Sequence, residues 1–222
     1  MLTYENISAH VQAVNDTEII GQAKQPGDEW FIDAHNTYAW YRAIAAVKAP
    51  KRILELGVRY GYAGIAMIKG ARHAGVTTPR YTGVDGEMDG LETNHTAEIN
   101  IYRYGYDSSF RIATRDDGAT QEVARIMKIN TRNTYQVVSA VGLHYDIVHV
   151  DGDHSLAGIL LELEIARMCV SRNGLILVDD IDTPHVRNEA EVFCRSRGII
   201  PMFIPTFHGM FLIDMSGGSE RF

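Results

Sequence analysis

The feature that most constrains this chain is a regular alternation between two kinds of segment. Short, β-branched apolar runs alternate with longer segments whose apolar residues recur at helical spacing. This alternation is typical of βαβ units and of a mostly parallel sheet. The runs predict strands at residues 52–56, 81–84, 110–113, 145–150, 175–178, 199–204 and 210–214. The other segments predict helices at residues 4–20, 34–47, 64–74, 92–104, 120–127, 157–169 and 182–197.

These elements predict an α/β fold with a Rossmann-like, doubly wound sheet of seven strands. The sheet should be mostly parallel, with a C-terminal β-hairpin, and helices should precede it. We expect residues 1–50 to form an N-terminal helical segment that serves as a lid or an oligomer contact. Residues 51–215 should form the main α/β domain, and the polar residues 216–222 a short tail. A chain of 222 residues is long enough to bury a core of its own.

Composition excludes several classes of partner. A formal net charge of −7 argues against a nucleic-acid or anionic-membrane surface, because both need basic patches. No run approaches the roughly 20 apolar residues of a membrane span, and the first residues do not resemble a signal peptide. The only cysteines, Cys169 and Cys194, predict reduced structural thiols in a cytoplasmic protein. A homo-oligomer stays possible.

The end of the first predicted strand carries an acidic residue and a glycine-rich turn, from Glu55 to Gly64. In open α/β sheets, ligands bind at the carboxyl ends of the strands. A dinucleotide site requires G-x-G-x-x-G, but Arg59 and Tyr62 stand where its second and third glycines belong. The carboxylate of Glu55 would repel a pyrophosphate, whereas it suits a cationic ligand such as a sulfonium amino acid. The turn therefore favours a site for such a ligand.

The ends of the second and third predicted strands are also acidic. Asp85 is placed to accept hydrogen bonds from both ribose hydroxyls of a nucleoside, a feature that NAD enzymes share. Asp116 and Asp117 follow the third strand, where they either line an adenine site or cap the next helix.

Three more carboxylates follow the fourth and fifth predicted strands: Asp151, Asp179 and Asp180. Neighbouring strands would bring them into one crevice, where like charges are costly unless a cation neutralises them or a proton is shared. Oxygen ligands of this kind suit Mg²⁺, Mn²⁺ or Ca²⁺. The alternative is that Asp151 is a turn residue and that Asp179 and Asp180 cap a helix. A zinc site at this place lacks its nitrogen or sulfur ligands.

Four motifs occur in order: ILELGVRYGYAG, YTGVDGE, YDIVHVDGDHS and GLILVDD. Together they resemble the class I S-adenosylmethionine-dependent methyltransferases over about residues 51–180. Among these the chain is most similar to the metal-dependent O-methyltransferases of the macrolide-sugar and cephalosporin-hydroxylase-like branch. The resemblance implies cofactor residues Glu55, Gly57, Gly61 and Asp85, to which Asp116 is added from its place after the third strand. It implies Mg²⁺ ligands Asp151, Asp179 and Asp180, and the general base His154.

The expected reaction is methylation of a hydroxyl on a small molecule such as a sugar, a polyketide or a phenol. Alternatives are a nucleotide-dependent oxidoreductase, a non-catalytic cofactor-binding protein, and a relative that keeps the cofactor without transferring methyl. An aromatic group offers either an acceptor pocket or simple packing: Trp30, Phe31, Tyr38, Trp40 and Tyr41. His149 is interpreted as a core histidine, while His35 and His208 are possible substrate contacts.

Overall fold

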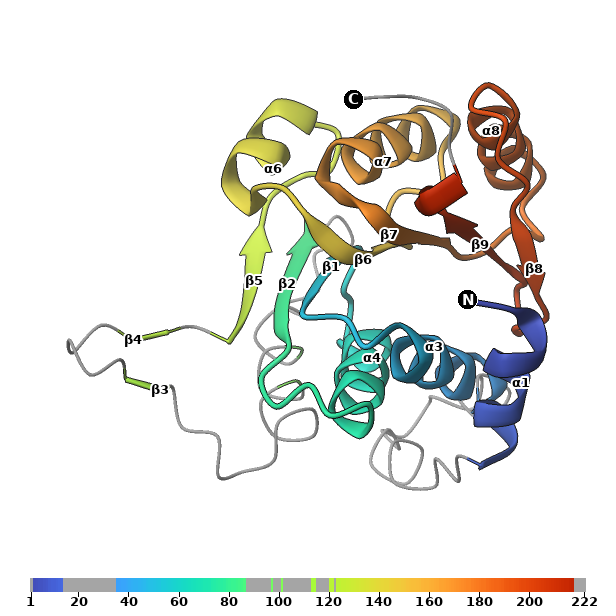
Figure 1. The fold of residues 1–222 in the computed structure, drawn as a ribbon. Coiled ribbons are helices and arrows are strands. Elements are labelled where there is room, and N and C mark those ends of the chain that lie inside the picture. The colour runs from blue at the N-terminus through green and yellow to red at the C-terminus, as the bar shows by residue number, and fades with distance from the viewer. Residues whose placement is uncertain are drawn as a thin grey trace, which may run out of the picture.

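The protein is organised around one seven-stranded sheet (Figure 1). The computed structural model describes residues 2–13, 35–86, 97, 101, 113–114, 120–121 and 123–217. The strand order is β5-β2-β1-β6-β7-β9-β8; β9 pairs antiparallel with β7 and β8, and all other pairs are parallel. The strands are β1 Arg52–Leu56, β2 Arg80–Asp85, β5 Ala124–Lys128, β6 Tyr145–Val150, β7 Val170–Val178, β8 Met202–Ile204 and β9 Met210–Asp214. The predicted doubly wound sheet with a C-terminal hairpin is confirmed.

Helices cover both faces of the sheet (Figure 1). One layer contains α1 Tyr4–Ala13, α3 His35–Lys48 and α4 Tyr62–His73. The other contains α6 Thr134–Val141, α7 Leu156–Cys169 and α8 Pro184–Arg195, and the short 3-10 helix Met215–Gly217 follows β9. Within the described ranges, no helix is long and apolar enough to cross a bilayer.

Strand periodicity divides the core into two layers. Ile53 and Ile147 face α3 and α4, while the alternate residues Leu54 and Val148 belong to the core under α7 and α8. All four side chains are fully buried. Successive side chains of a strand point to opposite faces, so strands buried on both sides consist of continuous apolar runs. That is why these strands could be located from the sequence.

Several helix boundaries follow from local capping. The Ser155 hydroxyl accepts a hydrogen bond from the Gly158 amide at 3.1 Å and begins α7. Thr183 occupies the N-cap of α8, with Pro184 in its first turn. Proline is favoured there because its missing N–H has no partner in a helix anyway. The predicted helix at residues 182–197 is therefore found at Pro184–Arg195.

The region after β2 differs from the prediction. The helix expected at residues 120–127 is wrong, because Ala124–Lys128 is strand β5 and pairs in parallel with β2. Its alternation of partly buried side chains is weak, so pairing with β2 decides its conformation rather than its own pattern. The helix on this part of the sheet is α6, which begins after the N-cap Asn133.

Two other expectations fall mostly outside the described residues. Of the strand expected at residues 110–113, only Ala113 is described, and it belongs to β3 (Ala113–Thr114). That strand pairs with β4 (Thr120–Gln121) in a separate two-stranded sheet. Of the helix expected at residues 92–104, Ala97 and Ile101 are described, and both are buried.

The contact between α3 and α4 depends on Gly70. A Cβ atom at this position would overlap the backbone carbonyl of Arg42 on α3. We predict that Gly70→Ala destabilises the fold, because overpacking costs about 1–3 kcal/mol and outweighs the gain in helix propensity of about 1 kcal/mol. Urea unfolding measures the difference, with Lys69→Ala on the same helix as the control. A Gly70→Ala protein as stable as the wild type would contradict the close helix packing.

Candidate active site

The candidate site lies where the central strands end. The backbone hydrogen-bond ladder continues one residue past each strand: Gly57 N–H donates to Val84 at 2.8 Å, and Asp151 N–H donates to Leu56 at 2.9 Å. Asp179 N–H donates to the Val150 carbonyl at 3.1 Å. Gly57, Asp151 and Asp179 therefore lie side by side at the carboxyl edge of the sheet. This edge is the usual ligand site of open α/β folds.

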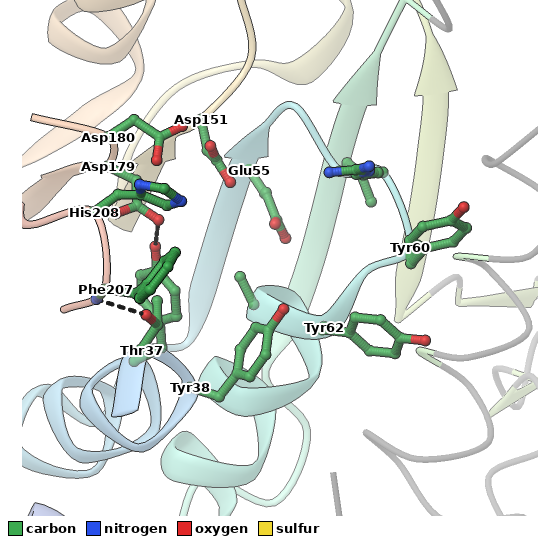
Figure 2. Close-up of a pocket in the computed structure, with 14 residues that line it drawn as sticks. Thr37, Tyr38, Glu55, Tyr60, Tyr62, Asp151, Asp179, Asp180, Phe207 and His208 are labelled. Carbon is green, nitrogen blue, oxygen red and sulfur yellow. Dashed lines mark hydrogen bonds between the residues drawn. The ribbon is translucent and has the colours of Figure 1, made fainter. Parts of the chain in front are cut away.

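A pocket opens at this edge (Figure 2). Helix α3 contributes Thr37, Tyr38 and Tyr41 to its wall, and the β8–β9 hairpin contributes Phe207 and His208. The remaining lining residues come from the ends of β1, β6 and β7 and from the start of α4: Glu55, Val58, Arg59, Tyr60, Tyr62, Ala63, Asp151, Asp179 and Asp180. The pocket thus has an acidic side and an aromatic side.

The turn after β1 needs glycine at two positions. Gly57 and Gly61 have φ angles of 84° and 79°, in the left-handed region where a side chain is strained. A Cβ atom on Gly57 would also overlap the Asp151 carbonyl, so β1 and β6 approach closely here. Arg59 adopts φ 48° without being glycine. Gly57 and Gly61, both predicted cofactor residues, therefore shape the loop that borders the pocket.

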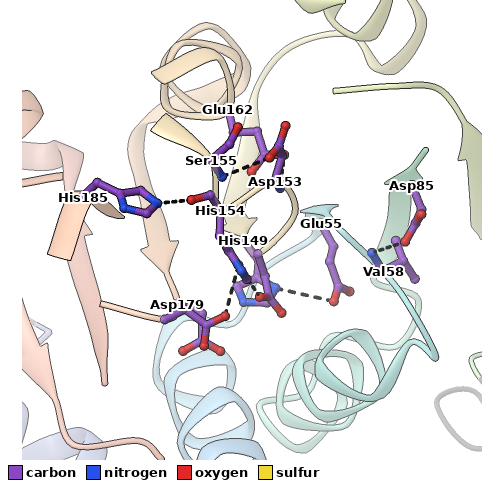
Figure 3. Close-up of polar contacts among 12 residues, drawn as sticks. Glu55, Val58, Asp85, His149, Asp153, His154, Ser155, Glu162, Asp179 and His185 are labelled. Atoms are coloured by element: carbon purple, nitrogen blue, oxygen red, sulfur yellow. Dashed lines mark hydrogen bonds and ion pairs between the residues drawn. The ribbon is translucent and has the colours of Figure 1, made fainter. Parts of the chain in front are cut away.

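Asp85 braces the same turn (Figure 3). Its Oδ2 accepts hydrogen bonds from the backbone amides of Val58, at 3.0 Å, and Arg59, at 2.9 Å. The carboxylate at the end of β2 is thus tied to the glycine-rich loop. Its expected contact with a ribose remains a prediction.

Glu55 is a buried carboxylate in the wall of the pocket. Its side chain accepts a hydrogen bond from the Tyr81 hydroxyl at 2.5 Å through Oε2, and its Oε1 lies 3.5 Å from His149 Nδ1. Burial raises the pKa of Glu55, while the contacts with His149 and Tyr81 oppose that increase. The expected contact with a cationic ligand stays a prediction, and these contacts supply a carboxylate with a fixed orientation.

Asp151, Asp179 and Asp180 converge in the pocket, with His154 between two of them. His154 Nε2 lies 3.5 Å from Asp151 Oδ1 and 3.1 Å from Asp180 Oδ2. Two overlapping groups hold ligand atoms within 4.8 Å of one another: His149, Asp151 and Asp179, and Asp151, His154 and Asp180. Asp180 adopts φ 55°, a conformation that aspartate tolerates better than most residues.

The electrostatics of this cluster are strongly perturbed. Burial and the neighbouring charge of Asp151 raise the pKa of Asp179 to about 7. The contact with Asp151 raises the pKa of His154 to about 9, with a further contribution from Asp180. The negative charge of Asp151 contributes to both shifts, because it favours a bound proton on either group.

Asp179 and His149 are held from below by helix α3. The Tyr41 hydroxyl donates to Asp179 Oδ2 at 2.6 Å and lies 2.8 Å from His149 Nε2. Burial alone would lower the pKa of His149, but the carboxylates of Glu55, Asp151 and Asp179 raise it to about 9. His149 is a fully buried core histidine, as its position in a strand suggested, and it faces the acidic cluster.

Glu162 on α7 supports the loop that carries Asp151 and His154. Its Oε1 accepts a hydrogen bond from the Asp153 amide at 2.9 Å, and a Cβ atom on Gly152 would overlap the same oxygen. Burial raises the pKa of Glu162 to about 6. Sequence reasoning missed this residue, although a glutamate within the apolar run of α7 was a usable signal.

The structure brings together most of the site residues expected from the sequence. Glu55, Asp151, Asp179 and Asp180 line the pocket, and His154 contacts two of these aspartates. Gly57 and Gly61 belong to the loop after β1, which Asp85 binds through two backbone amides. Asp116 lies outside the described residues, as do Trp30 and Phe31. Within the aromatic group, Tyr38 and Tyr41 line the pocket, while Trp40 is buried beside Tyr4 with ring centroids 5.5 Å apart. His208 lines the pocket too, and nothing is described for the side chain of His35.

Comparison with known proteins agrees with this geometry. Residues 54–181, more than half of the chain, match the model of a methyltransferase domain family. The chain therefore belongs to that family of methyltransferases. Membership of a methyltransferase family sets the oxidoreductase alternative aside. No curated protein matches it by sequence.

Solved structures share the fold at low sequence identity. The S-adenosylhomocysteine-bound methyltransferase PaMTH1 of Podospora anserina matches with a TM-score of 0.64 at 15% identity, over 96% of this chain and 97% of that chain. The O-methyltransferase TomG of Streptomyces achromogenes, solved with S-adenosylmethionine and involved in tomaymycin synthesis, matches with a TM-score of 0.60 at 14% identity, over 97% and 92%. An O-methyltransferase of Bacillus cereus in complex with S-adenosylhomocysteine matches with a TM-score of 0.58 at 11% identity, over 96% and 92%.

The raised pKa of His154 predicts how stability depends on pH. The folded-state pKa of about 9 exceeds the ordinary value of 6.5. The protonated ring therefore stabilises the fold fully below pH 6.5, and this contribution is lost as the pH rises through 9. In chelator, the free energy of unfolding should fall over this range more steeply in the wild type than in His154→Gln. Urea unfolding between pH 6 and pH 9.5 measures both.

His73→Gln is the control, because His73 is exposed at the end of α4. It should follow the wild-type pH dependence. Parallel curves for the wild type and His154→Gln would show that the carboxylates do not stabilise the imidazolium ring.

Proposed function

We propose that this chain is an O-methyltransferase that transfers a methyl group to a hydroxyl of a small molecule with the help of Mg²⁺ or a similar divalent cation. The observation that carries the proposal is the convergence of Asp151, Asp179 and Asp180 at the ends of two neighbouring strands, in the wall of the pocket. The family provides the methyltransferase class, and these carboxylates supply the finer assignment.

The residues present fit a hard cation. Asp179 Oδ1 is buried and has no hydrogen-bond partner within the described part of the chain. Buried polar atoms of this kind are costly unless something binds them. Carboxylate oxygens are the preferred ligands of Mg²⁺, with waters completing the shell. Asp151, Asp179 and Asp180 are the residues that would hold the ion.

The cofactor would lie against the turn after β1. Gly57 and Gly61 allow the close approach of a ligand to the backbone. Glu55, in the pocket wall, would bind the ammonium group of the cofactor, and Asp85, at the end of β2, would bind the ribose. The sulfonium of S-adenosylmethionine supplies the electrophilic methyl carbon.

His154 would then serve as the base for the acceptor. It takes the proton of the acceptor hydroxyl, the oxygen forms a bond to the methyl carbon, and the carbon–sulfur bond breaks to leave S-adenosylhomocysteine. When bound, a divalent cation would lower the pKa of the acceptor hydroxyl and neutralise the carboxylates that raise the pKa of His154. Tyr38 and Phe207 provide apolar surface for the acceptor on the other side of the pocket.

A binding and turnover experiment tests this function. Calorimetry should detect S-adenosylmethionine at micromolar affinity, about −8 kcal/mol, and S-adenosylhomocysteine should form with a panel of phenols and sugars when Mg²⁺ is present. Chelator should suppress turnover, and Asp179→Asn or Asp180→Asn should lower it by at least roughly 10-fold. His154→Ala should bind S-adenosylmethionine normally and turn over more slowly.

Asp214→Asn is the matched control, because Asp214 pairs with Leu175 on β7, away from the carboxyl ends of the parallel strands. It should keep wild-type turnover. Full activity in the presence of chelator would contradict the proposed metal dependence. Cofactor binding without turnover on any acceptor would favour the non-catalytic alternative instead.

A further inference from the structure

A continuous row of buried polar groups connects the two halves of the site. The Tyr81 hydroxyl contacts Glu55 Oε2 at 2.5 Å, and Glu55 Oε1 lies 3.5 Å from His149 Nδ1. His149 Nε2 lies 2.8 Å from the Tyr41 hydroxyl, which donates to Asp179 Oδ2 at 2.6 Å. Glu55, Tyr41 and Asp179 of this row also line the pocket, and Figure 3 shows how Glu55, His149 and Asp179 lie.

Hydrogen-bond chemistry fixes the direction of this row around Tyr41. A tyrosine hydroxyl has one proton, and here it is directed at Asp179. The Tyr41 oxygen must therefore accept from His149, so Nε2 of His149 carries a proton whatever the protonation of Nδ1. The two rings are packed edge to face with centroids 4.8 Å apart, which restricts other orientations.

The contact with Tyr41 makes the two carboxylate oxygens of Asp179 different. Tyr41 occupies Oδ2, whereas Oδ1 is buried without a hydrogen-bond partner among the described residues. One oxygen of the carboxylate is thus held by the protein, and the other is left for a ligand. Loss of a group that orients a metal ligand in this way typically costs about 10- to 100-fold in metal affinity or activity.

We propose that Tyr41 is a positioning residue for the metal site, and that its hydroxyl, oriented by His149, fixes which oxygen of Asp179 faces a bound cation. Tyr41 belongs to α3, outside the segment that matches the methyltransferase family. Helix α3 therefore contributes to a site whose proposed metal ligands follow strands of the sheet. This inference rests on the proposed metal site and adds a residue that acts through Asp179.

The first test is Tyr41→Phe in the full chain, with Mn²⁺ as the probe. Free Mn²⁺ is quantified by electron paramagnetic resonance, and S-adenosylmethionine binding is measured by calorimetry without metal. The variant should bind Mn²⁺ about 10- to 100-fold more weakly, with its S-adenosylmethionine affinity unchanged, because Glu55 keeps its contact with Tyr81. A loss of Mn²⁺ affinity with unchanged S-adenosylmethionine affinity would distinguish a positioning role from general misfolding of the site.

Tyr145→Phe is the matched control. Tyr145 is also a buried tyrosine, and its hydroxyl donates to the Val141 carbonyl at 2.8 Å, in the core on the other face of the sheet. Removing that hydroxyl should leave Mn²⁺ affinity at the wild-type value. An equal loss of Mn²⁺ affinity in both variants would assign the effect to packing and overturn the inference.

A pair of substitutions at His149 tests the same row even where Tyr41→Phe fails to fold. The amide of glutamine lies near the position of Nε2 and can still donate to Tyr41, whereas the amide of asparagine lies near Nδ1 and cannot. His149→Gln should keep more of the Mn²⁺ affinity than His149→Asn, which should resemble Tyr41→Phe. The reverse order, or equal affinities, would overturn the inference.

The wild-type measurement separates the two proposals. Absence of Mn²⁺ binding by the folded wild type would overturn the proposed metal site, and the role of Tyr41 with it. Tight Mn²⁺ binding by the wild type that persists in Tyr41→Phe would overturn the positioning role alone.

Discussion

The site depends on the electrostatic cost of gathering carboxylates at one edge of the sheet. Glu55, Asp151, Asp179 and Asp180 line the same pocket, and Glu55 and Asp179 are almost fully buried. Like charges this close raise one another's pKa unless cations or protons offset them. The negative charge raises the pKa values of His149 and His154, and it adds to the burial that raises the pKa of Asp179.

The strand order brings these carboxylates together. Parallel strands β1, β6 and β7 end at the same edge, and their hydrogen-bond ladder continues through Asp151 and Asp179. Backbone pairing fixes the positions of these groups before any ligand arrives. The surrounding residues then compensate the charge: Tyr41 donates to Asp179, and His154 lies between Asp151 and Asp180. His208 lines the same pocket, and its ring also acts on Asp180.

The sequence predicted the parts of the site that depend on strand order. Buried strands are continuous apolar runs, so the positions of Glu55, Asp85, Asp151 and Asp179 followed from where those runs end. The register of parallel neighbours then placed these residues together. The strand β5 was missed, because Ala124–Lys128 carries mixed polarity and its strand conformation depends on pairing with β2.

The groups that support the site were harder to predict, because they come from helices distant in sequence. Tyr41 belonged to an aromatic pattern that is more often simple packing than a pocket wall. Only the three-dimensional contact between α3 and the ends of β6 and β7 identifies its hydroxyl as a partner of Asp179. Glu162 is comparable: its burial against the loop after β6 is a property of the packed helix α7.

The central claim is that the strand-end carboxylates bind a divalent cation beside the methyl donor. The most direct test is a crystal structure of the full chain with S-adenosylhomocysteine and Mn²⁺, with diffraction data collected at the manganese absorption edge. The account predicts one anomalous peak within coordinating distance of Asp151, Asp179 and Asp180, on the pocket side of Asp179. Bound S-adenosylhomocysteine with no anomalous peak among these residues would contradict it.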